Sequence, residues 1–198
     1  GCVTAGEITI RMSAAANPEK AAGMARFFKC GPGQYGEGDR FLGLPNPAVR
    51  GVVRSCRDAV PEEAFKLLQS PWHEIRLCGL LLLVRCYSGG DESVREAVYR
   101  GYLAHTERIN NWDLTDLSAP GIVGEHLLNR SRARLYRLAA GSLLWEQRIA
   151  MVSTLTFIRH GDFADTLKLA ELFLPHRHDL MHKATGWMLR EVGKRDRA

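Results

Sequence analysis

The sequence predicts an all-α protein whose helices stack in succession as a solenoid. Apolar residues recur at helical spacing along most of the chain, and the alternating pattern typical of strands is nearly absent. Signals for helix starts return after roughly every 15 to 20 residues. Charged residues also recur near the starts of expected helices; they are Arg76, Asp113, Arg148 and Lys183. The intervals between them are 37, 35 and 35 residues, which is near the spacing of helix-pair repeats.

The first half of the chain contains clear helix starts. Asn17 followed by Pro18 offers a side-chain cap and a proline in the first turn. Pro47 or Pro61 opens the next helices, and Pro71 precedes a long apolar segment. We therefore expect helices over residues 19–29, after Pro47 or Pro61, and over residues 72–87 and 91–105.

The second half follows the same pattern. Its expected helices cover residues 112–117, 121–129, 131–139, 143–159, 163–174 and 182–194. One earlier segment differs, because Gly31–Asp39 holds four glycines among nine residues and is expected to form a turn-rich loop. It is not a phosphate-binding loop, because it lacks the GK[ST] ending and no strand precedes it.

Length and composition favour a basic globular protein. A chain of 198 residues suits one domain or a short repeat array, and we expect a single domain over residues 1–198. The formal net charge is +5, and 21 of the 27 basic residues are arginine. Because arginine binds phosphate bidentately and stacks on flat groups, this composition favours nucleic acid or another phosphate-bearing partner.

The cysteine and histidine patterns argue against a disulfide framework and against a metal site. The five cysteines form no CxxC pair, and Cys78 and Cys86 lie in an apolar run, as reduced core thiols do. We therefore expect a cytoplasmic protein, with no membrane-spanning run or signal peptide. His176, His178 and His182 lie at a helix junction, where we expect them to cap and contact solvent rather than bind zinc.

The last expected helix carries a tryptophan on its polar side. At about 100° per residue, Trp187 shares a face with Lys183, Arg190 and Lys194, while apolar residues such as Met188 lie opposite. One face of this helix is expected to pack, and the other to meet a polyanion with a flat or cationic group against the indole. The alternative is a surface tryptophan covered by lysine and arginine stems.

Trp112 and Asp116 form a second candidate site. They are four residues apart and are expected to face the same way at a helix start. An indole beside a carboxylate suits a cation or a centre that becomes cationic, because both groups attract positive charge. Asp113 is better placed to cap the helix or to bond to its own backbone. The alternative makes both aspartates caps and Trp112 a core residue.

Arg148 opens a helix that is apolar almost all round. A guanidinium group in such surroundings needs a carboxylate or an external phosphate, because an unpaired buried cation is costly. Two interpretations stay open: a salt bridge to Asp113 or Glu146, or a contact with a phosphate of the ligand.

With these features, the chain resembles the AlkD-like DNA glycosylases, which are built from HEAT-like repeats. The matches run nearly end to end in the expected order. They comprise Asn-Pro-Glu-Lys-Ala at residues 17–21, Met-Ala-Arg-Phe at 24–27, Phe-Leu-Gly at 41–43, Trp112 with Asp116, Arg-Ile-Ala at 148–150, and Lys-Ala-x-Gly-Trp-x-Leu-Arg at 183–190.

The resemblance implies a right-handed α-α superhelix with a concave basic face that grips duplex DNA, in an enzyme that removes N3- or N7-alkylated purines. It implies no metal or organic cofactor, and we expect a monomer in the bacterial cytoplasm. The catalytic carboxylate falls on Asp116, and its aromatic walls fall on Trp112 and Trp187. The expected DNA contacts are Phe27, Arg148, Lys183, Arg190 and Lys194.

Two features depart from the family pattern. The Gly31–Asp39 segment is longer than the connection in the best-known members, and the chain stops at residues 195–198, so we expect an incomplete C-terminal cap. Two other functions stay open. One is a non-catalytic paralogue that binds branched or distorted DNA, and the other is a protein-interaction scaffold of HEAT type.

Overall fold

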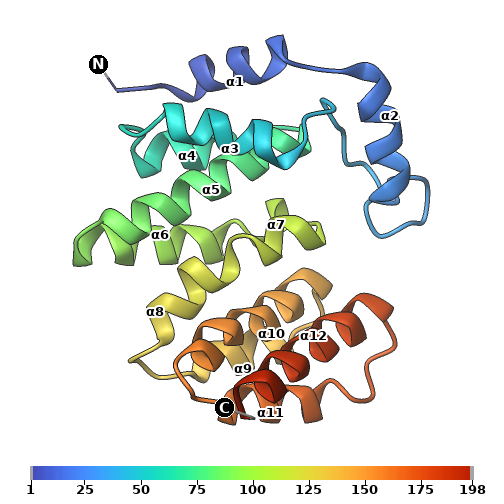
Figure 1. The fold of residues 1–198 in the computed structure, drawn as a ribbon, viewed down its shortest axis with the longest axis vertical. Helices are drawn as coiled ribbons and strands as arrows, with labels where there is room; N and C mark the ends of the chain where they lie inside the picture. Colours follow the sequence, from blue (N-terminus) through green and yellow to red (C-terminus); the bar gives the residue numbers. More distant parts are fainter. Residues whose placement is uncertain (1, 197–198) are drawn as a thin grey trace. The chain divides into compact units, whose positions relative to one another are not determined.

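The structure is a computed structural model that describes residues 2–196, and within that range it is all-α, as predicted (Figure 1). The described residues contain no strand, and Arg40 and Trp72 form an isolated parallel bridge. The chain divides into two compact units, Gly1–Leu114 and Thr115–Ala198. The boundary between them falls inside the short helix α7 (Trp112–Asp116).

The first unit is built from helices joined by turns and one long loop. The predicted starts are confirmed, because Pro18 opens α2, Pro47 lies in the first turn of α3 and Pro61 opens α4. Its helices are α1 (Ala5–Ala14), α2 (Pro18–Phe27), α3 (Asn46–Ser55), α4 (Pro61–Leu67), α5 (His73–Gly89) and α6 (Glu92–Ala104), followed by a 3-10 turn (Thr106–Arg108) and the start of α7.

Side-chain caps explain where several of these helices begin. Asn17 and Asp91 each accept a hydrogen bond from the backbone amide three residues on, at 3.2 and 2.9 Å. Helix α1 was not predicted, yet Thr4 caps it by accepting a bond from the backbone amide of Glu7 at 3.2 Å. Thr-x-x-Glu is a known helix-start signature, so the signal for α1 was present in the sequence.

Helix α5 forms the centre of the first unit. Its residues from His73 through Leu83 are all buried, so the helix meets other parts of the unit on every side. Helices α3, α4 and α6 pack against it, as Figure 1 shows. The long apolar run of the sequence therefore becomes the core of this unit.

The Gly-rich segment Gly31–Asp39 is a turn-rich loop, as predicted. Gly36 lies against the end of α2, where its backbone amide donates to the carbonyl of Lys29 at 3.0 Å. A Cβ at Gly36 would lie 2.4 Å from the carbonyl oxygen of Phe28, so only glycine fits this approach. The loop ends at Asp39, whose side chain is buried.

Glu74 fixes the segment that follows this loop to α5. Its buried carboxylate accepts hydrogen bonds from the backbone amides of Leu42, Gly43 and Leu44 at distances of 2.7 to 2.9 Å. Gly43 has a φ of +90°, and a Cβ there would lie 2.0 Å from the carbonyl oxygen of Asn17. Three amides on one carboxylate hold this segment firmly, because charge-assisted bonds are strong in a buried setting.

The second unit continues from α7 with a π-helical turn and then α-helices. The predicted helix over residues 121–129 is confirmed through Leu127, and its first part is this π-helical turn, which lies close against α10. Thr156 of α10 donates to the carbonyl of Pro120 at 2.7 Å. The elements are the π turn (Pro120–Gly124), α8 (Glu125–Leu127), α9 (Ala133–Ala140), α10 (Leu144–Arg159), α11 (Ala164–Leu172) and α12 (Asp179–Asp196).

Helix α10 forms the centre of the second unit, as α5 does in the first. Its residues from Arg148 through Ile158 are buried, and α9, α11 and α12 pack around it (Figure 1). Helix α12 contributes Met181, Ala184 and Met188 to this core, so its predicted apolar face is confirmed. Each unit is thus a central helix wrapped by others, consistent with a solenoid of helical repeats.

Some expectations stay predictions. They are the single domain over residues 1–198, the right-handed sense of the superhelix and its concave basic face. The last part of the expected incomplete cap, residues 197–198, lies outside the described residues. No helix in residues 2–196 is long and apolar enough to cross a membrane. All five cysteines have free thiols.

Candidate functional site

In the second unit, Asp116 and Arg148 form a two-point ion pair. Nε of Arg148 donates to Oδ1 of Asp116 at 2.9 Å, and Nη2 donates to Oδ2 at 2.8 Å. The hydroxyl of Thr115 also donates to Oδ1, at 3.0 Å. The Arg148 side chain is 6% exposed and that of Asp116 is 13% exposed. The carboxylate is therefore held in one orientation and keeps limited access to solvent.

The ion pair shows which carboxylate binds Arg148. Its carboxylate partner is Asp116, whereas the sequence had suggested Asp113 or Glu146. Nη1 of Arg148 donates to the backbone carbonyl of Leu180 at 2.6 Å, which fixes the guanidinium from a second side. In this structure the arginine holds Asp116 in place, and its predicted contact with a DNA backbone stays a prediction.

Helix α12 presents a partly exposed Trp187 with exposed cations beside it, as its spacing predicted. Lys183 and Lys194 each pair with an acidic neighbour on the same helix, at 3.2 and 3.0 Å. Exposed pairs of this kind are weak, so both lysines remain available to an anionic partner. Arg190 makes no hydrogen bond or ion pair with any residue in the part of the chain that the structure describes.

In the first unit, Trp112 lies at the end of a row of aromatic rings. Its ring stacks on Phe28 with a centroid distance of 5.2 Å, and Phe28 stacks on Phe41 at 5.1 Å. Phe27 meets Trp112 edge-on at 6.1 Å and is 65% exposed. Trp112 is itself partly exposed. The row holds one face of the indole in place.

A buried network of four charged side chains adjoins this row. His73, whose ring stacks on Phe41 at 4.5 Å, lies between two aspartates. Its Nδ1 is 2.5 Å from Asp39 and its Nε2 is 2.7 Å from Asp113. Arg76 donates to the other oxygen of Asp39 at 2.8 Å. All four side chains are at most 6% exposed, and we call them the His73 network.

The His73 network is electrically balanced when the histidine is protonated. Burial lowers the pKa of His73, but hydrogen bonds to Asp113 and Asp39 and the charges of both outweigh it and raise the pKa to about 9. Burial raises the pKa of Asp39, but the bond from His73 and the nearby charges of His73 and Arg76 hold it below its usual value. Two cations and two carboxylates then share one buried site, so no net charge is buried.

This network joins three segments of the first unit. Asp39 comes from the Gly-rich loop, His73 and Arg76 from α5, and Asp113 from the start of α7. Asp113 directly follows Trp112, and its second oxygen accepts a bond from the backbone amide of Leu114 at 2.8 Å. The predicted bond of Asp113 to its own backbone is therefore confirmed, and the network fixes the turn that carries Trp112.

The predicted repeat positions 76 and 148 have equivalent surroundings. Arg76 and Arg148 both lie near the start of the central helix of their unit, and both are buried. Each binds an aspartate and a backbone carbonyl. Asp113 is also buried, and only Lys183 is exposed. The charges at three of the four positions are therefore paired inside their units.

Sequence reasoning missed Asp39, His73 and Glu74 as site-forming residues. The sequence patterns assign no role to His73 or Glu74, and they identify Asp39 only as the end of the Gly-rich segment. One signal was available, because polar residues at the start of a wholly apolar helix need partners from elsewhere in the fold. Which partners they find depends on the path of the loop, which the sequence does not show.

The junction histidines bind the backbone, as predicted. The Nδ1 atoms of His176 and His178 accept bonds from backbone amides two residues on, at 3.0 and 3.1 Å. His182 contacts the carbonyl of His176. Within residues 2–196, no three histidine, cysteine or acidic side chains are grouped so that they could hold a metal ion.

Comparisons with known proteins agree with this architecture. A family model described as DNA alkylation repair enzyme matches residues 8–198. A predicted DNA alkylation repair enzyme from Enterococcus faecalis has a similar solved structure, with a TM-score of 0.66 and 18% sequence identity over 91% of this chain and 84% of that chain. At that identity the likeness shows a shared fold. No curated protein sequence matches this chain.

Proposed function

The chain belongs to the family of DNA alkylation repair enzymes, and from that premise we propose that it is a DNA glycosylase for purines alkylated at N3 or N7. The proposed reaction hydrolyses the N-glycosidic bond between the base and the sugar in duplex DNA. The observation that carries the proposal is the carboxylate of Asp116, which Arg148 holds by two hydrogen bonds and which keeps limited access to solvent.

The positive charge on the substrate base determines which groups the protein must provide for the reaction. A purine alkylated at N3 or N7 carries a positive charge, so it leaves as a neutral base without prior protonation. The positive charge then moves to the sugar as the glycosidic bond stretches. A fixed carboxylate stabilises this sugar cation and orients the attacking water, as carboxylates do in glycoside hydrolysis. Asp116 is the residue that we assign to this task.

Aromatic side chains suit the cationic base. We assign Trp112 and Trp187 to the lesion site, because the face of an indole attracts positive charge. Trp112 is held on one side by Phe28, and Trp187 is partly exposed on α12. Phe27 is the most exposed ring of its row and is the third aromatic group that we assign to DNA contact.

Phosphate contacts come from the exposed face of α12. Arg190 has no partner among the described residues, and Lys183 and Lys194 pair with acidic neighbours on the same helix while their own side chains stay exposed. We assign these three side chains to the DNA backbone. The resemblance also assigns Arg148 to the DNA backbone. Its buried ion pair with Asp116 instead favours a role in holding that carboxylate in position.

Base release from methylated DNA tests the proposal. We expect the intact protein to release 7-methylguanine and 3-methyladenine, and Asp116→Asn to slow release by about 100- to 1000-fold, since one fixed electrostatic contact in a transition state contributes on that order. Asp162→Asn is the matched control, because the Asp162 side chain is 46% exposed and pairs with Arg132, a residue that has no role in the proposed site. Release by Asp116→Asn at the rate of the control would contradict the role assigned to Asp116.

A stability control separates lost chemistry from lost fold. Asp116→Asn leaves the buried guanidinium of Arg148 with a weaker partner, which we expect to lower the free energy of unfolding by about 1–3 kcal/mol. The release assay is therefore run well below the melting temperature of the variant, with circular dichroism as the check. If the intact protein binds branched DNA tightly and releases no base, the chain is a non-catalytic paralogue and the proposal is wrong.

A further inference from the structure

The first unit carries a cluster of arginines that the proposed function does not yet use. Arg50 and Arg54 lie one turn apart on α3, Arg57 follows the end of α3, and Arg85 extends from the last part of α5. All four side chains are exposed. We call these four residues the α3–α5 arginine cluster.

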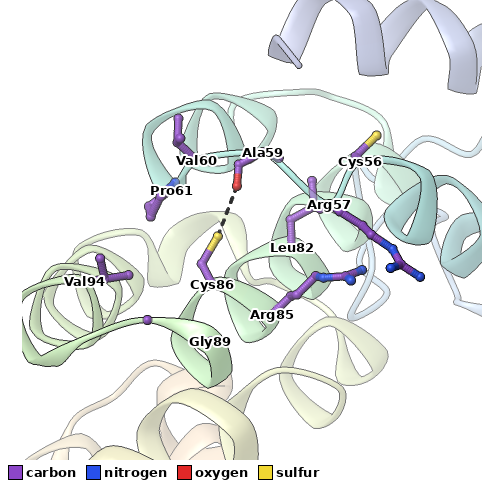
Figure 2. Close-up of a pocket in the computed structure, with 11 residues that line it drawn as sticks. Cys56, Arg57, Ala59, Val60, Pro61, Leu82, Arg85, Cys86, Gly89 and Val94 are labelled. Atoms are coloured by element: carbon purple, nitrogen blue, oxygen red, sulfur yellow. Dashed lines mark hydrogen bonds between the residues drawn. The ribbon is translucent and has the colours of Figure 1, made fainter. Parts of the chain in front are cut away.

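Two cavities of about 300 Å³ each lie among these arginines. One is lined by Arg50, Arg54 and Arg85 together with apolar side chains of α3 and α5. The other is lined by Arg57 and Arg85, and Figure 2 shows their guanidinium groups extending toward the same side. Because Arg85 lines both cavities, they adjoin each other. No acidic residue lines either one.

The four guanidinium groups are unpaired. None of them makes a hydrogen bond or an ion pair with any residue between 2 and 196, whereas Arg76 and Arg108 of the same unit bind carbonyls and Arg100 pairs with Glu96. A cluster of like charges without counter-ions is unfavourable unless a partner supplies the negative charge. The cluster is therefore better suited to binding an anion than to stabilising the unit.

Overall positive charge does not explain the cluster. Residues 1–114 contain 14 basic and 13 acidic residues, a net charge of +1. Three of the acidic side chains, those of Asp39, Glu74 and Asp113, are buried and bound inside the unit, against one buried basic side chain, that of Arg76. The exposed surface of the unit is therefore more positive than its composition indicates, and the unpaired part of that charge includes the arginines along α3 and α5.

The form of the cluster indicates a partner with many phosphates. Arg50 and Arg54 lie about 6 Å apart along the helix axis, since each residue rises about 1.5 Å. This spacing is close to the rise of about 7 Å over two phosphate steps of one DNA strand, at about 3.4 Å a step. Guanidinium groups bind phosphate bidentately, and backbone contacts of this kind position a protein on DNA without reading its sequence. A single small phosphate would occupy only part of this surface.

We propose that the α3–α5 arginine cluster binds the sugar-phosphate backbone of duplex DNA as an anchor independent of sequence. The inference rests on the proposed function in one respect, which is that duplex DNA is the substrate. It adds phosphate contacts in the first unit to those assigned to α12 in the second. The cluster takes no part in bond cleavage.

Binding to an undamaged duplex at several salt concentrations tests this anchor. The test variant is Arg54→Gln/Arg85→Gln. The matched control is Lys66→Gln/Arg100→Gln, which removes the same charge from the same unit at exposed residues that already have ion-pair partners. Each phosphate contact contributes about 0.9 to the slope of log affinity against log salt. We expect the slope to fall by about 1.8 in the test variant and to stay unchanged in the control.

Base release gives a second readout. We expect the test variant to raise KM for methylated DNA by about tenfold and to keep the rate at saturation, because anchoring contacts act equally in the ground and transition states. Equal salt slopes in the test and control variants would overturn the anchor and leave the glycosylase proposal intact. Lost affinity for single-stranded RNA with unchanged duplex binding would assign the cluster to RNA and also overturn it. An intact protein that binds no duplex would contradict the proposed function itself.

Discussion

A carboxylate can stabilise a developing sugar cation only if it keeps its orientation while the bond breaks. Asp116 meets this condition, because Arg148 and Thr115 bind both of its oxygens. The arginine also weakens the field of the carboxylate, since the pair has no net charge. Fixed orientation favours the stabilisation of a sugar cation and partial neutralisation weakens it, and the Asp116 side chain, which is 13% exposed, keeps limited access to solvent.

His73 gives the first unit a stability that depends on pH. Its pKa of about 9 in the folded protein lies above the ordinary value of 6.5, because Asp39 and Asp113 favour the protonated ring. The stabilisation is therefore complete below pH 6.5 and is lost as the pH rises through 9. We expect the free energy of unfolding to fall by about 2–3 kcal/mol across that window. Urea unfolding at pH 6.5, 8 and 9.5 measures it.

The variant His73→Gln provides the comparison for this prediction. It removes the titrating group but keeps polar atoms near both aspartates, so its stability should change much less between pH 6.5 and 9.5. The substitution lowers the free energy of unfolding at every pH, so the two proteins are compared by how steeply this free energy changes with pH. Parallel curves for the two proteins would show that His73 does not titrate in this range.

Among single residues, the sequence identified the exposed groups better than the buried ones. Trp187 with its cations was placed correctly on α12, because exposure follows from helical periodicity. The partner of Arg148 was not identified, and neither was the His73 network. A buried charge indicates that a partner of opposite charge exists. The sequence offers several carboxylates as that partner, and only the tertiary packing determines which one lies close enough.

The helices and the Gly-rich loop depend on different kinds of information. Helix starts such as Pro18, Pro47 and Pro61 were predicted from local rules and are confirmed. The Gly31–Asp39 segment was predicted as a loop, but its attachment to α5 through Asp39 and Glu74 was not. The attachment makes the loop a fixed part of the unit and brings a carboxylate to His73.

Substitution of Gly43, with Gly23 as the control, tests how closely the segment after this loop packs against the start of α2. Gly43→Ala places a Cβ 2.0 Å from a backbone oxygen at a φ of +90°, so we expect a loss of more than about 2 kcal/mol in the free energy of unfolding. Gly23→Ala lies inside α2 with nothing within 4 Å, and there we expect no loss or a gain of up to about 1 kcal/mol. Urea denaturation compares the two. Similar effects of both substitutions would contradict the tight contact at Gly43.

Charge is distributed unevenly along the whole chain. Residues 1–114 have a net charge of +1, and residues 115–198, with 13 basic and 9 acidic residues, have +4. The first unit offers phosphate contacts through a local arginine cluster, whereas the second has a general excess of positive charge in addition to the cations of α12. Both kinds of contact weaken as the salt concentration rises.

Thermal unfolding with added DNA tests whether the folded chain binds a duplex. A ligand that binds only the folded state at 100 times its Kd adds about 2.7 kcal/mol, which corresponds to a rise in Tm on the order of 5 °C for a chain of this size. We expect this rise with an undamaged duplex at about 50 mM salt, and its loss at about 500 mM, where phosphate contacts are screened. An equal rise at both concentrations would indicate binding without phosphate contacts.

The sequence by itself determined the all-α class, most helix boundaries, the loop at Gly31–Asp39 and the exposed face of α12. These follow from local capping and from periodicity, which act over a few residues and need no knowledge of the rest of the chain. Tertiary structure alone decided that Arg148 binds Asp116, that His73 lies between Asp39 and Asp113, and that four unpaired arginines gather along α3 and α5. The reason is that buried charges and surface clusters join residues distant in sequence, and only packing brings them within hydrogen-bonding distance or onto one surface.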